Sequence, residues 1–469
     1  MRFNSFKLVL LLSIVFTFVS CDWLDTITDE PSTNPCFVSL TFAANDTIEG
    51  LEDAEFTLEW DETLNDSVIV NLDSLPYNTD VTHLIPTFTI YSSYSATLYT
   101  DSMGVVKDTI ALTGTDTINF DRPLMKIRNV AEDEVTEKTY PLKVNVHKVE
   151  PELYQWNKVV NSIYTHAGSS QKGLLFNDSI YFFVNSGLNN SLYKSPDGRK
   201  WSDRVIITEL PGSAEIRNIV QFKNKLYLVS EGTKLYSSAN GVNWTSADFM
   251  TEDYLFVNLL YEFSSKLWAI VKVKSDDSYR FATSVDGATW IIIGKIPENF
   301  PVGDYAALSF ASRTNQPKML IAGGVNASGE LLNNIWSSEN GSYWVDFSRE
   351  NQTLGSLAGI SMVIYDDKLL LFGGADENRE VVDNFYMVSI DEGLSWSAPD
   401  TTYNQLQQLI ITPTATGPDT AYVNYEPRYL QTALVKGKEI ILIGGRDRSK
   451  VYTDVWTGKL NRLSFLIQD

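Results

Sequence analysis

The chain has 469 residues, of which 43% are hydrophobic and 12% are aromatic. This length and composition are typical of two or three folded domains and exclude a disordered chain. The 37 basic and 59 acidic residues give a net charge of −22 at pH 7. Because so negative a protein repels polyanions, we expect no nucleic-acid partner.

The first residues have the three parts of an export signal. Arg2 and Lys7 supply positive charge, residues 8–18 form an apolar run, and small residues precede Cys21. The run is shorter than the roughly 18 residues that a membrane-spanning helix needs, so we expect a cleaved signal peptide over residues 1–20. The segment resembles the lipoprotein signals of Bacteroidetes. That resemblance implies that Cys21 carries acyl chains, palmitate among them, and that these chains attach the protein to a membrane of the cell envelope.

Residues 21–36 are acidic, contain proline and lack apolar periodicity, so we expect a flexible tether. Acidic residues after the lipidated cysteine resemble the surface-export signals of Bacteroidetes lipoproteins. In enteric bacteria, Asp at this position instead resembles an inner-membrane retention signal. We favour the outer membrane, facing the cell surface. With Cys21 acylated, we expect Cys36 to have no partner within the chain, which contains two cysteines.

Residues 37–150 alternate strand-like runs with turn signals. The runs are rich in β-branched and aromatic residues and show no long helical period, which is typical of an antiparallel sandwich. We expect an Ig-like β-sandwich with strands at residues 37–43, 55–60, 67–72, 86–92, 96–100, 108–113 and 140–149.

A repeat occupies residues 151–469. Five units carry a Ser, an acidic or amide residue, a Gly and a Trp in this order, with 43 to 54 residues between successive Trp residues. This is the period of a propeller blade. The units are Ser195–Trp201, Ser238–Trp244, Ser284–Trp290, Ser338–Trp344 and Ser389–Trp396.

The repeat predicts one hairpin turn per unit. Asp-Gly or Asn-Gly tolerates the two positive φ angles of a type I′ turn, and the Ser hydroxyl can hydrogen-bond into the turn. We expect the Trp to start an outer strand and to pack between sheets rather than to bind sugar. A second apolar strand pair precedes each turn, so four strands per unit follow.

Three units share a further motif of apolar residues followed by Gly-Gly, at residues 319–324, 369–374 and 440–445. This motif resembles the kelch repeat, and the fifth turn resembles the Asp-box of sialidase-like propellers. The first four turns are one residue shorter than an Asp-box. The whole chain resembles Bacteroidetes lipoproteins of unknown function that pair a sandwich with a propeller.

We expect six blades and an all-β fold, an Ig-like sandwich followed by a six-bladed β-propeller. A strand around Trp156 should close the ring against residues 451–467. The hairpins of the six blades are expected near residues 172–184, 217–229, 257–272, 317–324, 361–374 and 432–445.

The residues for catalysis or metal binding are scarce. The chain has three histidines, His83, His147 and His166, scattered over both domains, so we expect no metal site and no cofactor, and we assign no catalytic residue. Propeller ligands usually meet the loops around the central channel. Seven polar or aromatic residues are expected near that rim and form the candidate binding site: Tyr164, His166, Arg217, Asp304, Tyr305, Arg428 and Tyr429.

The leading hypothesis is a surface-tethered, non-enzymatic lipoprotein that binds a glycan or an envelope protein. A second hypothesis is a propeller glycoside hydrolase or lyase that acts on polysaccharide through paired carboxylates and Arg428. A third is a structural subunit of an outer-membrane complex.

Overall fold

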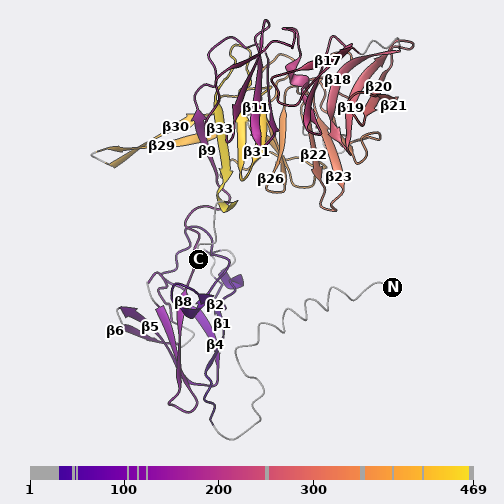
Figure 1. Ribbon diagram of the computed structural model, residues 1–469. Helices are drawn as coiled ribbons and strands as arrows, with labels where there is room; N and C mark the ends of the chain where they lie inside the picture. The colour runs from indigo at the N-terminus through magenta and orange to yellow at the C-terminus, as the bar shows by residue number, and fades with distance from the viewer. Residues whose placement is uncertain are drawn as a thin grey trace, which may run out of the picture. The chain divides into compact units, whose positions relative to one another are not determined.

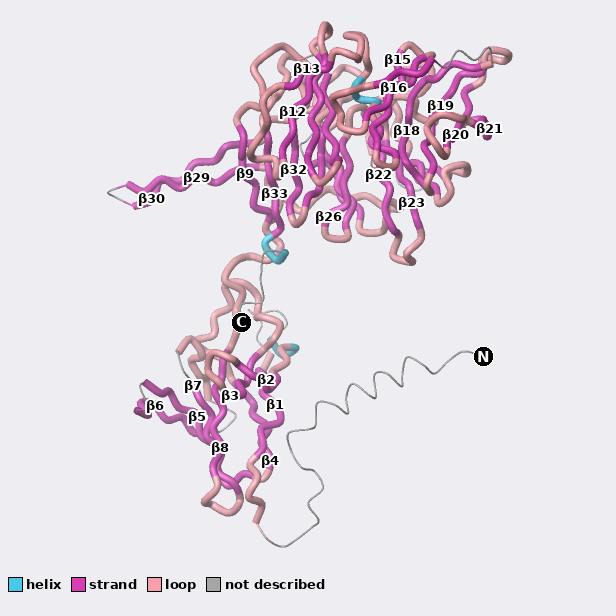
Figure 2. Tube along the Cα trace, viewed as in Figure 1, coloured by secondary structure: helices cyan, strands magenta, loops and turns pink. Residues whose placement is uncertain are grey.

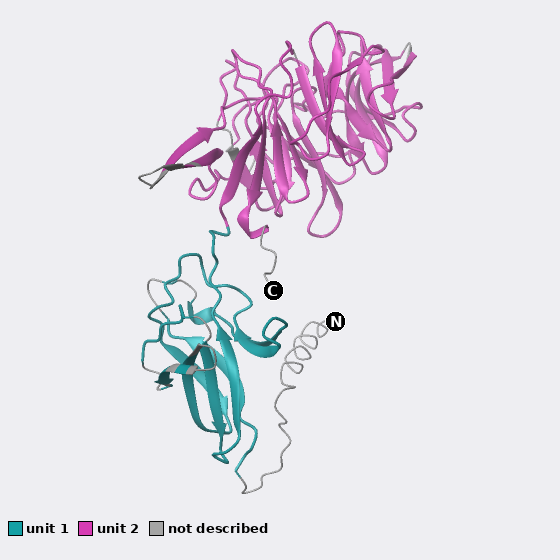
Figure 3. Ribbon diagram, turned by 60° about the vertical axis from the view of Figure 1, so that its left-hand side comes forward, with its two compact units in different colours: residues 1–151, 465–469 teal, residues 152–464 magenta. Residues whose placement is uncertain are grey.

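The computed structural model describes residues 31–44, 48, 51–102, 105–112, 116–122, 125–168, 170–248, 253–348, 354–382, 385–414 and 417–463. Two units form along the chain, Met1–Pro151 with Phe465–Asp469, and Glu152–Ser464 (Figure 3). The expected signal peptide and Cys21 lie outside the described residues. In the described part of the chain, no helix has the length and apolar character needed to cross a membrane.

The N-terminal unit is built from two sheets. In the smaller sheet, β1 (Cys36–Phe42) pairs antiparallel with β4 (Pro86–Tyr91). The larger sheet has the order β2 (Thr57–Asp61), β3 (Asp66–Val70), β8 (Glu137–Lys143), β7 (Met125–Ala131), β5 (Ser93–Ser102) and β6 (Val105–Ala111). Strands β3 and β8 run parallel and the other neighbours run antiparallel. A short 3-10 helix, η1 (Leu51–Asp53), precedes β2.

Strand β7 was not expected from the sequence. Its residues nevertheless alternate between the two faces of the sheet, because Met125, Ile127 and Ala131 are buried while Arg128 is exposed. Arg128 Nε donates to Glu137 of the neighbouring strand β8 at 2.7 Å. The strand therefore has one apolar face and one charged face.

The expectation for Cys36 is wrong in this structure. Cys36 is buried at the start of β1 and is disulfide-bonded. Its partner lies outside the described residues. The expectation of no partner depended on acylation of Cys21.

The C-terminal unit contains six sheets of three or four strands within the described residues, and a separate hairpin (Figure 1). The first sheet consists of β10 (Ser170–Phe176), β11 (Ser179–Asn185), β12 (Asn190–Ser195) and β13 (Val205–Ile207). The second consists of β14 (Val220–Phe222), β15 (Lys225–Ser230), β16 (Lys234–Ser238) and β17 (Thr245–Asp248). The third consists of β18 (Tyr254–Phe263), β19 (Lys266–Val273), β20 (Tyr279–Ser284) and β21 (Ile291–Lys295). The fourth sheet is β22 (Ala306–Ala311), β23 (Pro317–Ala322), β24 (Ile335–Ser338) and β25 (Val345–Asp346).

The last two sheets differ from the others at their outer edge. The fifth is β26 (Ser361–Tyr365), β27 (Lys368–Phe372) and β28 (Phe385–Ser389), extended by a single bridge between Val388 and Ser397. The sixth is β31 (Thr432–Lys436), β32 (Glu439–Ile443), β33 (Val455–Leu460) and β9 (Tyr154–Val160).

The first strands of the six sheets make a ring of contacts. β10 contacts β31, β31 contacts β26, β26 contacts β22, β22 contacts β18, and β18 contacts β14. The 3-10 helix η2 (Ile216–Asn218) contacts β10, β15 and β18, and so fills the remaining junction. Sheets whose first strands surround one axis form a β-propeller.

Strand β9 closes this ring from the other end of the repeat region. It pairs antiparallel with β33, with Trp156 opposite Gly458. The pairing confirms the prediction that the segment around Trp156 adds a strand to the C-terminal segment. The Trp156 ring lies 6.1 Å from Phe372 of the fifth sheet, and a Cβ at Gly458 would collide with the indole.

The repeat turns differ from the predicted type I′ geometry. In each turn the Ser Oγ accepts the N–H of the Gly, at 2.8 to 2.9 Å. The side-chain oxygen of the Asp or Asn accepts hydrogen bonds from backbone N–H groups further along the turn. In the first four turns the Gly has a positive φ and the preceding Asp or Asn has none. The type I′ prediction is wrong there because the side-chain bonds hold the Asp or Asn in a different conformation.

Each turn packs against the preceding sheet, as predicted for the Trp residues. Gly341 has φ +77°, and a Cβ there would lie 2.5 Å from Cζ2 of Trp268 on the preceding sheet. The ring of Trp344 lies 6.3 Å from Phe281 on the same sheet, and its indole N–H donates to the Gly341 carbonyl at 2.9 Å. The glycines of the other four turns lie against Ile441, Tyr181, Tyr227 and Leu320 of their preceding sheets, where a Cβ would lie 3.3, 3.0, 2.5 and 2.7 Å from the nearest atom, respectively.

A hairpin of β29 (Gln407–Thr414) and β30 (Gly417–Asn424) was not expected from the sequence. It projects from the rest of the unit beside β9, where Gln408 accepts the Lys158 N–H at 3.1 Å (Figure 2). The 3-10 helix η3 (Asn461–Leu463) follows β33.

The packing of Gly341 yields a direct test. Gly341→Ala should lower the free energy of unfolding by about 2–4 kcal/mol, because it adds both backbone strain and a collision with Trp268. Gly329 has φ +83° and open space around it, so Gly329→Ala should cost only the strain, about 1–2 kcal/mol. Urea unfolding of both variants measures the difference. Equal losses would contradict the account of packing between sheets.

Candidate functional site

The ring of first strands encloses a cavity of about 740 Å³. Residues of β10, β14, β18, β22, β26 and β31 all line it, together with Arg217 and Asn218 of η2. A volume in this range is typical of a small-molecule binding site. We call this cavity the channel.

A second cavity of about 410 Å³ adjoins the channel. Gln171, Arg217 and Leu430 line both cavities. The remaining wall comes from loops of the first and sixth sheets, including Glu215 and Arg446. We call this second cavity the mouth, because it widens the channel at the end where the first strands begin.

Two of the seven expected residues form an ion pair at the junction of channel and mouth. Arg217 Nη1 lies 2.5 Å from Asp304 Oδ1, and the two side chains are about one-third exposed. Nη2 of the same guanidinium lies 3.7 Å from Glu215. The helix η2 places Arg217 here, and the turn before β22 places Asp304, which has φ +51°.

Backbone hydrogen bonds link the starts of three neighbouring first strands. The Gly359 N–H donates to the Asp304 carbonyl, and the Leu430 N–H donates to the Gly359 carbonyl, both at 2.8 Å. Asp304, Gly359 and Leu430 all have positive φ, so they occupy equivalent turns in the fourth, fifth and sixth sheets. This row of bonds fixes the position of the ion pair relative to the channel.

Tyr305 also lines the channel. Its hydroxyl accepts a hydrogen bond from Asn258 Nδ2 at 3.1 Å, and burial raises the pKa of the Tyr305 phenol above its usual range. A phenol with so high a pKa stays neutral at physiological pH. It can therefore position a ligand by hydrogen bonding but cannot supply a phenolate.

Tyr164 and His166 pack beside the channel rather than in its wall. Their rings stack at 4.6 Å, and His166 Nε2 lies 2.9 Å from the Tyr193 hydroxyl. The Tyr164 hydroxyl accepts Gln171 Nε2 at 2.5 Å, and burial raises the pKa of Tyr164 to about 12. Neither residue is among those lining the channel or the mouth. They support Gln171, which lines both.

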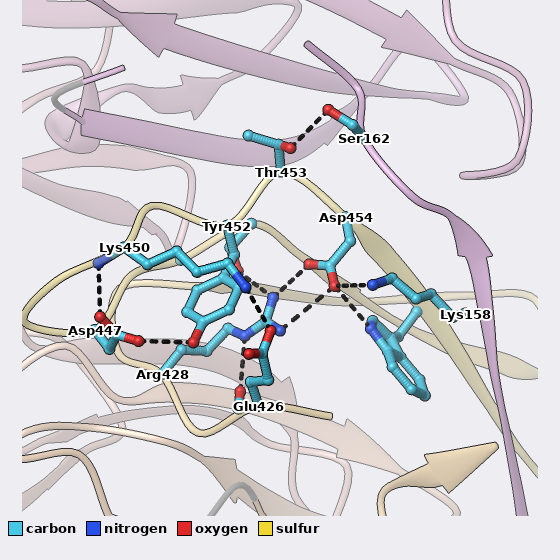
Figure 4. A network of polar contacts seen from close by, with 12 residues as sticks. Lys158, Ser162, Glu426, Arg428, Asp447, Lys450, Tyr452, Thr453 and Asp454 are labelled. Carbon is cyan, nitrogen blue, oxygen red and sulfur yellow. Dashed lines mark hydrogen bonds and ion pairs between the residues drawn. The ribbon is translucent and has the colours of Figure 1, made fainter. Parts of the chain in front are cut away.

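Arg428 is buried and holds loops of the sixth sheet together (Figure 4). Its side chain is 1% exposed, and Nη1 lies 2.5 Å from Asp454 Oδ1. The guanidinium carbon lies 4.0 Å from the ring centre of Tyr425 and 3.7 Å from that of Tyr452. The sequence placed Arg428 at the rim, but this packing leaves no guanidinium surface for a ligand.

Tyr429 lies beside the mouth. Its backbone exchanges two hydrogen bonds with Arg446, at 2.8 and 2.9 Å, while its partly buried side chain is not among those lining either cavity. Of the seven expected residues, the structure therefore brings Arg217, Asp304 and Tyr305 together in the channel wall.

The sequence reasoning missed several polar residues of the channel wall, among them Lys172, Asn258 and Gln431. All three lie within or directly before the first strand of a sheet. Gln431 follows Leu430 as Tyr305 follows Asp304, so Gln431 and Tyr305 occupy equivalent positions in their sheets. Aligning the first strands of the sheets by such equivalent positions could therefore have identified residues of the channel wall from the sequence.

No group of three or more His, Cys, Asp or Glu side chains that could hold a metal ion occurs among the residues that the structure describes.

Comparisons with known proteins identify relatives of both units. The model of the DUF6242 beta propeller domain matches residues 150–468. The model of the domain of unknown function (DUF6242) N-terminal domain matches residues 38–144. A search of curated proteins found no match. Among solved structures, one described as "Structure of YjhT" is similar at a TM-score of 0.40 and 14% identity, covering 63% of this chain and 96% of that chain.

The buried pair of Arg428 and Asp454 yields a prediction for stability. Burial opposes ionisation of Asp454, but the hydrogen bond and charge of Arg428 outweigh it, so the pKa of this carboxyl lies below its usual range. Asp454→Asn should lower the free energy of unfolding at pH 7 by about 3–5 kcal/mol, because it leaves a buried cation without a counter-ion.

The matched control is Glu426→Gln, which breaks the exposed pair with Lys450 and should cost about 0–1 kcal/mol. A carboxyl with a lowered pKa adds stability above its unfolded pKa of about 3.9, and this stability is lost as the pH falls through the folded pKa. The difference between wild type and Asp454→Asn should therefore shrink below about pH 4. Urea unfolding from pH 7 to pH 3 tests this, and a loss independent of pH would contradict it.

Proposed function

The chain belongs to the DUF6242 family, and we propose that it is a surface-tethered, non-enzymatic lipoprotein that binds a glycan in the channel of its β-propeller. The observation that carries this proposal is the cavity of about 740 Å³ that all six first strands line. We further propose that the six sheets are the blades of one ring with kelch-like diglycine turns. The N-terminal unit then serves as an Ig-like spacer.

The channel wall supports a sugar ligand. Amide side chains line it at Gln171, Asn218, Gln221, Asn258 and Gln431. Amides both donate and accept hydrogen bonds, so they match sugar hydroxyls, which do the same. Between the amides lie apolar residues of the first strands, which exclude water from the apolar faces of a sugar ring.

The carboxylates of the channel support binding rather than hydrolysis. Among the described residues that line the channel, the acidic side chains are Glu262 and Asp304. Asp304 is ion-paired to Arg217, and Glu262 accepts the Lys223 N–H at 3.1 Å. A glycosidase needs one carboxyl with a raised pKa to donate a proton. Asp304 is instead held in its ion pair with Arg217, and Glu262 in its bond to the Lys223 N–H.

We propose that acyl chains on Cys21 hold the protein in the outer membrane, facing the cell surface. The sequence contains two cysteines, so a thioether-linked lipid at Cys21 and an intramolecular disulfide exclude each other. Two or more acyl chains bury enough CH₂ groups for stable attachment, at about 0.8 kcal/mol for each group.

The anchor has its own test. Cys21→Ala should stay at the precursor mass and fail to incorporate labelled palmitate, because it lacks the sulfur that the lipid modifies. Cys36→Ala is the matched control and should be labelled like the wild type. Mass spectrometry of the wild-type protein should find lipid mass on the peptide that begins at Cys21. A peptide pair joined by a disulfide between Cys21 and Cys36 in the membrane-extracted protein would contradict the anchor.

Glycan binding is tested with the processed, detergent-extracted protein. On a panel of polysaccharides, affinity electrophoresis should show retardation by at least one glycan, and no reducing ends should appear after overnight incubation. Release of reducing ends would favour the hydrolase. Absence of retardation by every glycan would contradict the proposed function.

A further inference from the structure

We propose that the junction of channel and mouth holds a subsite for an oxyanion of the glycan, a carboxylate or a sulfate, with Lys172 and Arg217 as its cations. This inference rests on the proposed glycan binding and adds the class of glycan, an acidic one.

Lys172 is a cation without a counter-ion. It lies in β10 and lines the channel, and no described carboxylate is ion-paired to it. Burial lowers the pKa of the Lys172 ammonium, and the neighbouring charge of Arg217 lowers it further, so a bound anion would stabilise the charged form. Lys172 is half-buried, and cations that are withdrawn from water are normally paired. An oxyanion between Lys172 and Arg217 would supply the missing partner.

Arg217 has donors left after its ion pairs. Nη1 is bound to Asp304 at 2.5 Å, whereas Nη2 lies 3.7 Å from Glu215, beyond hydrogen-bond distance, so Nη2 keeps N–H donors for a ligand. A guanidinium has five N–H donors in one plane, which match the oxygens of a carboxylate or a sulfate. Since Arg217 lines both cavities, an oxyanion bound to it would sit at their junction.

Other polar atoms of the channel wall also lack partners. Within the described residues, no hydrogen bond reaches Oδ1 of Asn258, the hydroxyl of Tyr261, or either amide atom of Gln431, and all of these atoms are buried. All three residues line the channel. Unsatisfied buried polar atoms are rare because each one loses its bonds to water. Because these atoms are shielded from the channel, a ligand there would reach them only after a side-chain rearrangement.

The charge of this region contrasts with that of the whole protein. The chain carries −22, whereas the charged side chains that line the two cavities balance, with Lys172, Arg217 and Arg446 as the cations and Glu215, Glu262 and Asp304 as the acidic residues. The distant surface charges are screened beyond about 8 Å in physiological salt, so the local cations determine binding. Among these groups, Lys172 has no ion-pair partner in the described part of the chain, so it is the cation left for an anionic ligand.

The test compares three trisaccharides of the same galactose skeleton: a galacturonate, a sulfated and a neutral one. Isothermal titration calorimetry of the processed protein should show at least about tenfold tighter binding of one acidic trisaccharide than of the neutral one. Preference for the galacturonate identifies a carboxylate site, and preference for the sulfated sugar identifies a sulfate site. Affinity for the preferred acidic sugar should fall as salt rises.

Variants separate charge from structure. Lys172→Met and Arg217→Met should each reduce affinity for the acidic sugar about tenfold and leave the neutral sugar unaffected, since they remove a charge-assisted bond. Lys172→Arg should retain the preference because it keeps the charge. Lys295→Met, at an exposed residue of the outer strand β21, is the matched control and should change nothing. Thermal melting checks that each variant is folded.

Two results would overturn the inference in distinguishable ways. Equal affinity for acidic and neutral sugars, or equal losses for both in Lys172→Met, would reject the oxyanion subsite and leave the proposed glycan binding intact. Absence of binding for all three sugars, together with the failure of the wider polysaccharide panel, would reject both.

Discussion

The packing of each repeat turn on the preceding sheet is the constraint on which the propeller depends. At Gly341 the chain approaches Trp268 so closely that no side chain fits. Three residues later, Trp344 of the same motif fills the space between the sheets. The Ser hydrogen bond holds the turn in the shape that allows this approach. Because the contact recurs at five turns, each sheet is oriented relative to its neighbour by the same local chemistry.

Closure of the ring supplies the sixth contact from the opposite end of the repeat region. Trp156 of β9 packs against Phe372 of the fifth sheet, where Gly458 leaves room for it. Once the ring is closed, the first strands surround the channel, and the row of hydrogen bonds from Leu430 to Gly359 to Asp304 fixes its rim. The position of Arg217 opposite Asp304 therefore follows from the same contacts that hold the sheets together.

Local chemistry explains what the sequence could predict. The turns and the closing strand at Trp156 were predicted because the same few side chains recur at a fixed period. Strand β7 was missed because its charged Lys126 and Arg128 conceal the apolar alternation, and the type I′ turn was wrong because side-chain oxygens compete for the backbone. Arg428 was misplaced and Lys172 missed for one reason: whether a cation is paired depends on contacts between distant segments, such as that of Arg428 with Asp454.

The most direct test of the account is a crystal structure of the processed protein with a bound acidic trisaccharide. The account predicts electron density for the sugar inside the channel, in contact with residues of several first strands, and its acidic group between Lys172 and Arg217. Density for the sugar on the outer strands or on the N-terminal unit, with the channel holding only water, would contradict it.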